Sequence, residues 1–299
     1  MKRLEERLQA GETLLVDGAM GTFLQSLGLK PGECPELWCL SHPDDVKSIH
    51  RAYREAGSDV VECNSFGGTR YKLLHYGLEA RVAEINRAAA ALAREVAGVD
   101  QHVLGSLGPT GAFMEPYGDE TEAAIVAAFA EQARALEAGG ADAVVVETMS
   151  ALEECCAAVR AARENTGMTV VASFTFEPRH GGGYASMMGV SPAQFAQAAA
   201  AAGAHVVGAN CGLGPDMMAE IVREMRAAAP GVPLLAMPNA GLPALVDGKT
   251  VFRETPDDMA RKSLALREAG ASLIGGCCGT TPAHIRAMAI ALRTPRAPS

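Results

Sequence analysis

The adjacent cysteines Cys277 and Cys278 are the residues of this sequence most suited to metal chemistry. They stand between glycines in the segment GGCCG, and a third cysteine, Cys211, lies upstream in the segment GANCG. Glycine offers a buried thiol no side chain to pack against, which argues against a purely structural place in the core. Three thiolates can hold Zn²⁺ and leave a fourth tetrahedral position open, which is the pattern of catalytic zinc sites.

The spacing alone leaves three other interpretations of the cysteine pair open. It fits a buried core position, a vicinal disulfide, or half of an unrelated redox site. For Cys155 and Cys156, which lie in the helical stretch SALEECCAAVRAARE, burial as small hydrophobic side chains is the favoured interpretation.

An open zinc position would suit a sulfur substrate. A free aliphatic thiol has a pKa of about 8.5, so at neutral pH it is mostly protonated and a weak nucleophile. Zinc binds a thiol as thiolate and releases its proton. Because three cysteine thiolates already overcompensate the metal charge, the substrate sulfur keeps its electron density and remains a nucleophile.

The elements that would position these residues alternate along the whole chain. Short apolar runs, typical of strands buried on both faces, alternate with Ala-rich helical stretches. The expected strands are Thr13–Val16, Asp59–Glu62, His102–Leu107, Ala143–Glu147, Thr169–Thr175, His205–Ala209, Pro233–Met237 and Ser272–Gly275. The expected helices lie near 43–56, 79–97, 119–138, 151–164, 192–202, 215–228, 256–269 and 282–292.

Eight such repeats predict an α/β fold, a (β/α)8 TIM barrel, with an open doubly wound sheet as the alternative. No linker divides the chain, so we expect residues 1–299 to form one domain. In a parallel barrel the chemistry gathers where the strands end. The residues at these ends are Asp17-Gly18, Glu62-Cys63, Glu147, Asn210-Cys211 and Cys277-Cys278. Since the sixth and eighth strands are second neighbours, the three cysteines should meet at one mouth.

Composition excludes several classes of protein. The net charge is −9 and no run of Lys or Arg occurs, so a nucleic-acid partner is not expected. The charged N-terminus, MKRLEERLQAGETLL, lacks the apolar core of a signal peptide. Apolar runs such as Ala88 to Ala93 are far shorter than the roughly 20 residues that span a bilayer. We expect a cytoplasmic protein with no membrane contact.

Five segments resemble the homocysteine S-methyltransferase family, in the same order: VDGAMGTFLQ, GSLGPTG, GANCGLGP, MPNAGLP and GGCCGTTPAHI. The likeness runs from about Asp17 to Ile285. The N-terminal part, with CPELW, IHRAYREAGSDVVECNSFGGTR and YGLEARVAEIN, is most similar to the homocysteine-binding module of cobalamin-dependent methionine synthase.

The resemblance implies a TIM barrel with zinc held by Cys211, Cys277 and Cys278. It matches the family's amino-acid-binding acid to Asp17, beside Gly18, and a second acid to Glu147. Polar strand ends are the ordinary interpretation of two such acids, but together they would clamp an α-ammonium group.

Other positions near the mouth carry less specific signals. The family's module often reads ETNTF where this chain has Glu62-Cys63-Asn64-Ser65-Phe66, so Cys63 is an extra thiol near the mouth. Asn210 and Asn239 fit either a turn or the orientation of substrate or zinc ligands. The Gly-rich loop 177–189 fits either a lid or a passive connection.

The resulting hypothesis is a zinc-dependent S-methyltransferase that converts homocysteine to methionine. The expected mouth has no basic cluster for a folate tail, and the module that this chain resembles most belongs to a cobalamin-dependent enzyme. We therefore expect a methyl-corrinoid, carried in trans by a separate protein, as the donor, with S-methylmethionine as the rival. A non-catalytic zinc- or thiol-binding barrel and a phosphate-binding lyase or aldolase are the other classes considered. No expected strand ends in the Lys that a Schiff-base aldolase needs.

Overall fold

Eight parallel strands form one sheet in the computed structural model, which describes residues 1–246 and 249–294. They are β1 (Leu14–Leu15), β2 (Val60–Glu62), β3 (His102–Leu107), β4 (Ala143–Met149), β5 (Thr169–Phe174), β8 (Val206–Asn210), β9 (Leu234–Met237) and β12 (Ala271–Ile274). The hydrogen-bonded order is β1-β12-β9-β8-β5-β4-β3-β2. A parallel bridge between Val16 and Val60 joins the two outer strands and closes the sheet, which confirms the (β/α)8 barrel.

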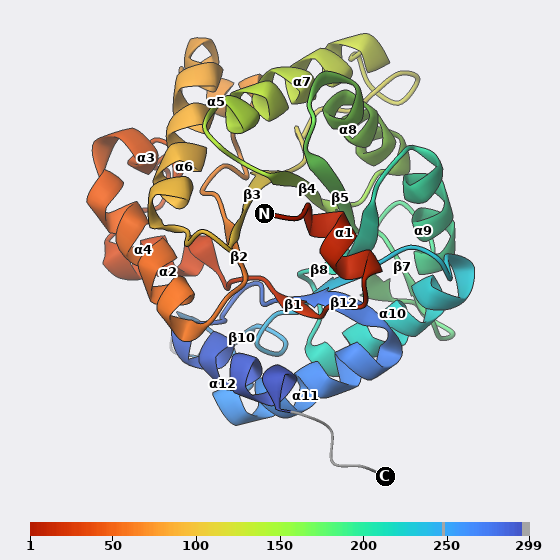
Figure 1. Cartoon of the computed structure of the whole chain (residues 1–299). Helices are drawn as coiled ribbons and strands as arrows, with labels where there is room; N and C mark the ends of the chain where they lie inside the picture. The colour runs from red at the N-terminus through yellow and green to blue at the C-terminus, as the bar shows by residue number, and fades with distance from the viewer. Residues whose placement is uncertain (247–248, 295–299) are drawn as a thin grey trace.

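A ring of helices surrounds the barrel (Figure 1). It contains α4 (Pro43–Ala56), α6 (Val82–Val96), α7 (Glu122–Ala138), α8 (Leu152–Asn165), α9 (Pro192–Ala201), α10 (Pro215–Ala228), α11 (Pro256–Ala269) and α12 (Pro282–Arg293). Capping explains where several begin: the Ser191 hydroxyl accepts from the backbone N–H of Gln194, and Thr121 caps α7 in the same way. The expected helix 79–97 is divided into a 3₁₀ turn, η1 (Glu79–Arg81), followed by α6.

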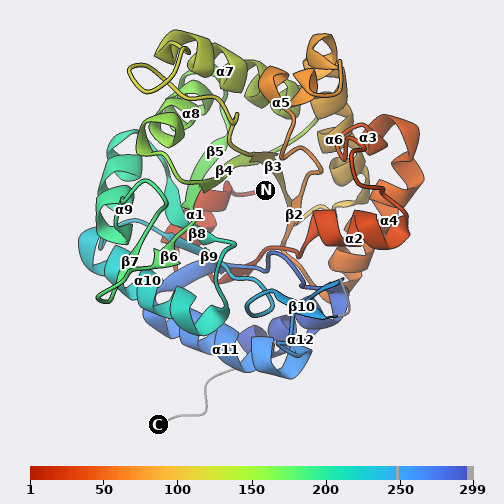
Figure 2. The same ribbon diagram turned by 180° about the vertical axis from the view of Figure 1, so that it is seen from behind.

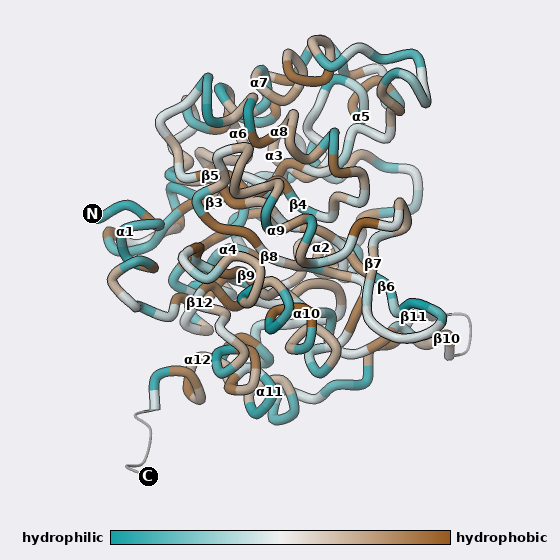
Figure 3. The backbone as a smooth tube through the Cα atoms, turned by 90° about the vertical axis from the view of Figure 1, so that its right-hand side faces the viewer, coloured by the Kyte–Doolittle hydropathy of each residue, from teal (hydrophilic) through white to brown (hydrophobic). Residues whose placement is uncertain are grey.

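One end of the barrel is closed by α1 (Leu4–Gln9), which the sequence analysis did not anticipate (Figure 1). Leu4 and Leu8 pack into the cluster of side chains that fills the barrel interior, and the Thr169 hydroxyl, at the start of β5, donates to Glu5. A larger apolar layer lies between the strands and the helices. Figure 3 shows the hydrophobic segments concentrated along the strands in the middle of the molecule. The closed end leaves the carboxyl ends of the strands as the open mouth.

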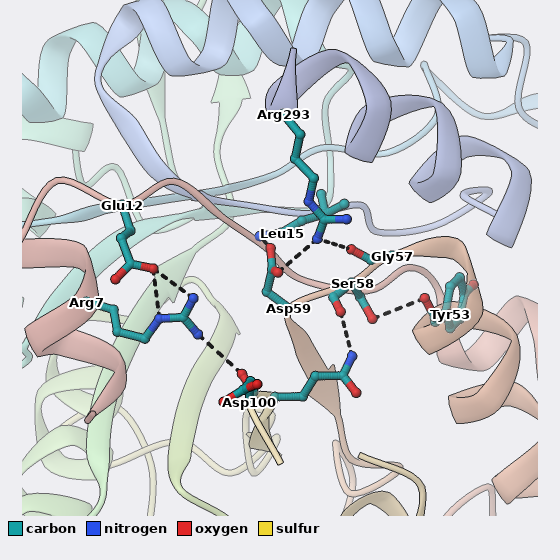
Figure 4. Close-up of polar contacts among 10 residues, drawn as sticks. Arg7, Glu12, Leu15, Tyr53, Gly57, Ser58, Asp59, Asp100 and Arg293 are labelled. Carbon is teal, nitrogen blue, oxygen red and sulfur yellow. Dashed lines mark hydrogen bonds and ion pairs between the residues drawn. The ribbon is translucent and has the colours of Figure 1, made fainter. Parts of the chain in front are cut away.

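The seam between the first two strands is tied by Asp59 (Figure 4). Its carboxylate accepts from the backbone N–H of Leu15 at 2.9 Å and from Arg293, on the last helix, at 2.9 Å. Arg293 also donates to the carbonyl of Gly57, the left-handed residue that ends α4. The two ends of the chain therefore brace the same strand junction.

The loops at the mouth contain small elements that the sequence analysis did not predict. They are α2 (Met20–Leu27), α3 (Trp38–Ser41), α5 (Arg70–Leu74), the hairpin of β6 (Glu177–Pro178) and β7 (Tyr184–Ala185), and the hairpin of β10 (Ala244–Val246) and β11 (Lys249–Val251). Figure 2 shows them from the mouth side. Gly181, Gly182 and Gly183 form the turn of the first hairpin, with φ of 107°, 101° and 75°, a succession that glycine alone adopts readily.

In the described part of the chain, no helix has both the length and the apolar character needed to cross a lipid bilayer.

Candidate metal and substrate site

The three cysteines predicted to bind zinc come together at the barrel mouth. Cys211 follows β8, while Cys277 and Cys278 follow β12, and β9 lies between these strands in the sheet. Backbone hydrogen bonds tie the two cysteine segments to the loop after β9: the N–H of Cys277 donates to Pro238, the carbonyl of Cys278 accepts from Ala240, and the carbonyl of Leu213 accepts from Asn239. Because β8 and β12 both neighbour β9 in the sheet, cysteines that are distant in the sequence lie in one cluster.

The geometry of the sulfur atoms fits a tetrahedral metal. All three sulfurs lie within 4.8 Å of one another, and the Sγ atoms of Cys211 and Cys278 are 4.0 Å apart. Two ligands of a tetrahedral zinc with Zn–S bonds of about 2.3 Å stand about 3.8 Å apart. Cys211 adopts a left-handed backbone conformation, with φ of 59°, which is rare outside glycine and concentrates at functional sites.

Hydrogen bonds among the three thiols shift their pKa values and favour a negative charge on the cluster, which suits a cation. Hydrogen bonds from Cys277 and Cys278 hold the pKa of Cys211 at about 3, and the Asn239 side chain helps by hydrogen bonding to the same sulfur. The same hydrogen bonds to Cys211 raise the pKa of Cys277, and that of Cys278 to about 11. A soft divalent metal would displace the remaining thiol protons and bind the three sulfurs as thiolates.

A cavity of about 270 Å³ lies directly over these sulfurs. Its wall contains all three cysteines, the acids Glu62 and Glu147, and the first turn of α2. Ala19, the residue before α2, contributes no side-chain cap, so the backbone N–H groups of the first turn have no partner of that kind. The cavity thus combines soft donors, carboxyl groups and a helix N-terminus.

Glu147 is held rigidly at the end of β4. One carboxylate oxygen accepts from the Ser106 hydroxyl, and the other accepts from Nδ2 of Asn210 at 3.0 Å. Burial raises the pKa of the Glu147 carboxyl. Asn210 itself is fully buried, and its Oδ1 accepts from the Thr148 backbone and the Ser173 hydroxyl. Because both the oxygen and the nitrogen of its amide are hydrogen bonded, Asn210 holds Glu147 in a fixed position. It also lies directly before Cys211 in the chain.

Asp17 lies at the end of the first strand, 1% exposed. Its Oδ2 accepts from the backbone N–H of Glu62 at 3.0 Å, whereas its Oδ1 is buried with no hydrogen-bond partner. Burial raises the pKa of the carboxyl, and the nearby charge of Glu147 raises it further. Asp17 is not part of the cavity wall, unlike Gly18, which follows it.

The loop after β1 and the second cysteine segment are joined by Thr280. Its hydroxyl accepts from the backbone N–H of Ala19 at 3.1 Å and donates to the Cys277 carbonyl at 2.7 Å. The Tyr53 hydroxyl spans the same pair of loops, because it contacts the carbonyls of Ala19 and Thr280. A Cβ on Gly18 would lie 2.7 Å from the Tyr53 ring, so this close approach requires glycine.

Comparison with known proteins identifies the family. The model of the family described as homocysteine S-methyltransferase matches residues 14–292. The chain belongs to the homocysteine S-methyltransferase family. Methionine synthase of Mycobacterium tuberculosis is 36% identical over 314 residues, which cover 99% of this chain and 25% of that protein. Methionine synthase of Mycobacterium leprae is 35% identical, with 98% and 25% covered. The chain thus spans about a quarter of the length of these relatives.

Solved structures agree on the fold. The homocysteine methyltransferase MmuM from Escherichia coli, in its metallated form, has a TM-score of 0.77 at 24% identity, covering 96% of this chain and 99% of that one. A methyltransferase from Methanosarcina mazei has a TM-score of 0.64 at 12% identity, covering 98% of both chains. The family predicted from the motifs is therefore confirmed, and so is its barrel.

In this member of the homocysteine S-methyltransferase family, four residues near the site were not predicted from the sequence: Glu62, Ser106, Tyr53 and Thr280. Glu62 carried the same signal as Glu147, an acid that ends an apolar strand, but no second feature drew attention to it. The hydroxyl groups carried no signal, because their partners are backbone atoms of distant loops. Cys63, the departure from the family pattern, lies in the cavity wall, and burial raises the pKa of its thiol.

Proposed function

We propose that this chain transfers a methyl group to the thiol sulfur of homocysteine and so forms methionine. The observation that carries the proposal is one cavity whose wall contains both the three converging cysteine sulfurs and the carboxyl groups of Glu62 and Glu147. An amino acid with a thiol at the end of a short side chain matches both features.

Cys211, Cys277 and Cys278 are proposed to hold Zn²⁺, since three soft thiolate donors with an open fourth position match the preferences of catalytic zinc. When bound, zinc would supply the positive charge that lowers the pKa of a substrate thiol and keeps its sulfur ionised near neutral pH. Asn239 and the Thr280 hydroxyl hold the Cys211 sulfur and the Cys277 backbone in place.

The amino-acid part of homocysteine is proposed to bind through residues of the strand ends. Asp17 and Glu147 supply negative charge for the α-ammonium group, and Asn210 orients Glu147. Gly18 lets the first loop lie against the cysteine segment, so the N-terminus of α2 faces the cavity. The free N–H groups of that first turn suit the α-carboxylate.

The reaction follows as one displacement. The homocysteine sulfur forms a bond to the methyl carbon of the donor, while the bond between that carbon and its leaving group breaks and the leaving group keeps the electron pair. The thiol proton passes to solvent when the substrate binds. The protein's part is to hold the sulfur in line with the methyl group, because orientation supplies much of the rate in such reactions.

The donor is proposed to be a methyl-corrinoid carried by a partner protein. A rim of exposed apolar side chains borders the mouth on loops that follow β2, β3, β5 and β9. This apolar rim consists of Phe66, Phe113, Tyr117, Met187, Leu242 and Leu245, each at least 40% exposed. Such a concentration of exposed apolar residues is typical of an interaction site and suits a large donor that docks over the cavity.

The experiment is a comparison of methyl donors. Zinc-loaded protein is incubated with homocysteine and, separately, methylcobalamin, S-methylmethionine, betaine or methyltetrahydrofolate, and methionine is measured. The proposal predicts methionine from methylcobalamin and none from methyltetrahydrofolate alone. Turnover with S-methylmethionine and none with methylcobalamin would replace the corrinoid donor by the sulfonium. No methionine from any donor would contradict the methyltransferase assignment.

A further inference from the structure

Glu62, the last residue of β2, has a carboxyl group whose hydrogen bonding is incomplete. Its side chain forms part of the cavity wall, and its Oε2 is buried without a hydrogen-bond partner. Asp17 presents a second such atom, Oδ1, and its Oδ2 accepts a hydrogen bond from the backbone N–H of Glu62. Two buried carboxylate oxygens without partners, on residues that are hydrogen bonded to each other, lower the stability of the protein unless a ligand donates hydrogen bonds to them.

Glu147 completes the group. Its carboxyl group lies within hydrogen-bond reach of the Glu62 carboxyl, an arrangement that requires a proton between the two, and Ser106 contacts both groups. Burial, followed by the charges of Glu147 and Asp17, raises the pKa of Glu62. The three acids therefore repel one another when ionised and lack a cation to balance them.

No side chain in the wall provides that cation. Among the described residues that line the cavity there is neither Lys nor Arg. A primary ammonium group carries one positive charge and three N–H donors, which suits a group of three acids in which Glu62 Oε2 and Asp17 Oδ1 have no hydrogen-bond donor. The chemistry of the array thus selects a small organic cation.

We infer that Glu62 is a further specificity-determining residue, which receives the α-ammonium group of the substrate together with Asp17 and Glu147. This inference rests on the proposed function. Because Glu62 lines the cavity and Asp17 does not, Glu62 is the first of the pair that the ammonium meets. Asp17 holds the Glu62 backbone in place and adds its charge from the barrel side.

The inference has a consequence for substrate choice. A thiol that keeps the carbon chain and carboxylate of homocysteine but lacks its amino group, 4-mercaptobutyrate, can still reach the cysteine cluster. It would leave the three acids without a counter-charge. The ratio of the dissociation constants of 4-mercaptobutyrate and homocysteine therefore measures the contribution of the three acids, independently of how the sulfur binds.

The test is to measure the dissociation constants of both thiols by calorimetry on zinc-loaded wild-type protein and on Glu62→Gln, which removes the charge and keeps the shape. We expect homocysteine to bind Glu62→Gln about 10- to 100-fold more weakly, the range for loss of one charge-assisted hydrogen bond. The affinity for 4-mercaptobutyrate should change less than about threefold on the same scale, and the zinc content should be unchanged.

Glu36→Gln is the matched control. Glu36 is another buried acid in the same cavity wall, but its carboxylate already accepts from the backbone N–H of Gly67 at 2.6 Å and from the Cys34 thiol. Its substitution should change the two affinities by the same factor. If Glu62→Gln does not fold, Glu62→Asp keeps the charge on a shorter side chain and should reduce the preference for homocysteine without abolishing it.

The possible results distinguish a failure of the role inferred for Glu62 from a failure of the proposed function. If wild-type protein prefers homocysteine and Glu62→Gln keeps that full preference, the inference is wrong and the proposed function stands. Equal weakening of both thiols would mean that Glu62 only supports the structure. If the wild-type protein binds no homocysteine, the proposed function fails and the inference fails with it.

Discussion

Asn210 Nδ2 donates a hydrogen bond to Glu147 Oε2 at 3.0 Å, which joins the acidic wall of the cavity to the cysteine cluster. Asn210 is the residue before Cys211, and its side chain also contacts both the backbone and the hydroxyl of Thr148. Thr148 and Cys211 have φ of 57° and 59°, so one buried amide stabilises two strained turns.

Replacement of this amide should therefore affect substrate binding and stability together. Asn210→Asp removes the donor and sets a second carboxylate against Glu147. We expect the free energy of unfolding to fall by about 1–3 kcal/mol and the affinity for homocysteine to fall at least about tenfold. Urea denaturation and calorimetry measure the two quantities. Ser173→Ala, which removes only one hydrogen bond to Asn210, should cost about 1 kcal/mol; an Asp variant no worse than this control would contradict the role of Asn210.

Asp17 should matter for the amino acid and not for the metal. Asp17→Asn removes a charge behind Glu62, while its remaining oxygen can still accept from the Glu62 backbone. We expect homocysteine to bind roughly 10-fold more weakly or worse, with zinc content and the affinity for 4-mercaptobutyrate unchanged. Metal analysis and calorimetry test this. If the variant binds both thiols more weakly by the same factor, Asp17 has no part in recognising the amino group.

The contact between the first loop and the cysteine segment should depend on the absence of a side chain at Gly18. A Cβ there would lie 2.7 Å from the ring of Tyr53, which is fully buried, and 2.9 Å from the Thr280 hydroxyl. Gly18→Ala should destabilise the protein by about 1–3 kcal/mol and weaken homocysteine binding. Gly21→Ala is the control, because a Cβ at that helical position meets nothing within 4 Å and should stabilise α2 by up to about 1 kcal/mol. Similar urea midpoints for the two variants would argue against the packing constraint.

The strands and outer helices were predictable because local physics decides them. His102–Leu107 is buried on both faces and occurs where its apolar run predicts, and the helices that begin at Pro43, Pro215 and Pro256 start at prolines suited to a first turn. The hairpin of β6 and β7 was not predicted. Its strands are only two residues long, and Glu177 and Pro178 are exposed, so no apolar alternation marks them.

The site was only partly predictable. Cys211, Cys277 and Cys278 could be grouped, because thiols next to glycine are unusual and strand order brings the ends of β8 and β12 close. The unpartnered oxygens of Glu62 and Asp17 depend on three-dimensional contacts among distant strands, which leave no pattern in the chain. The same holds for the bridge from Thr280 to Ala19.

His50 should make stability depend on pH. Both ring nitrogens are buried without partners, and burial lowers the pKa of His50 to about 4. Between the unfolded value of about 6.5 and this folded value, the unfolded chain binds a proton that the folded chain does not. The free energy of unfolding should therefore fall as pH falls through this window, by up to about 3 kcal/mol in total.

The variant His50→Leu removes this dependence. Its free energy of unfolding, measured in urea at pH 7 and at pH 4.5, should change less between the two pH values than that of the wild type. His75→Leu, at an exposed position, should keep the wild-type slope. A His50→Leu slope equal to that of the wild type would mean that His50 is not the group responsible.

The central claim is that three cysteines hold zinc and that the substrate sulfur joins them, and X-ray absorption at the zinc edge tests it most directly. The wild-type protein should bind about one zinc per chain with three sulfur neighbours, rising to four when homocysteine is added, as expected for a catalytic site with one open position. Cys277→Ser should lose most of the metal, whereas Cys156→Ser, at a half-buried helical position outside the cluster, should keep it. Fewer than three sulfur neighbours, no added sulfur with homocysteine, or full zinc in Cys277→Ser would contradict the account.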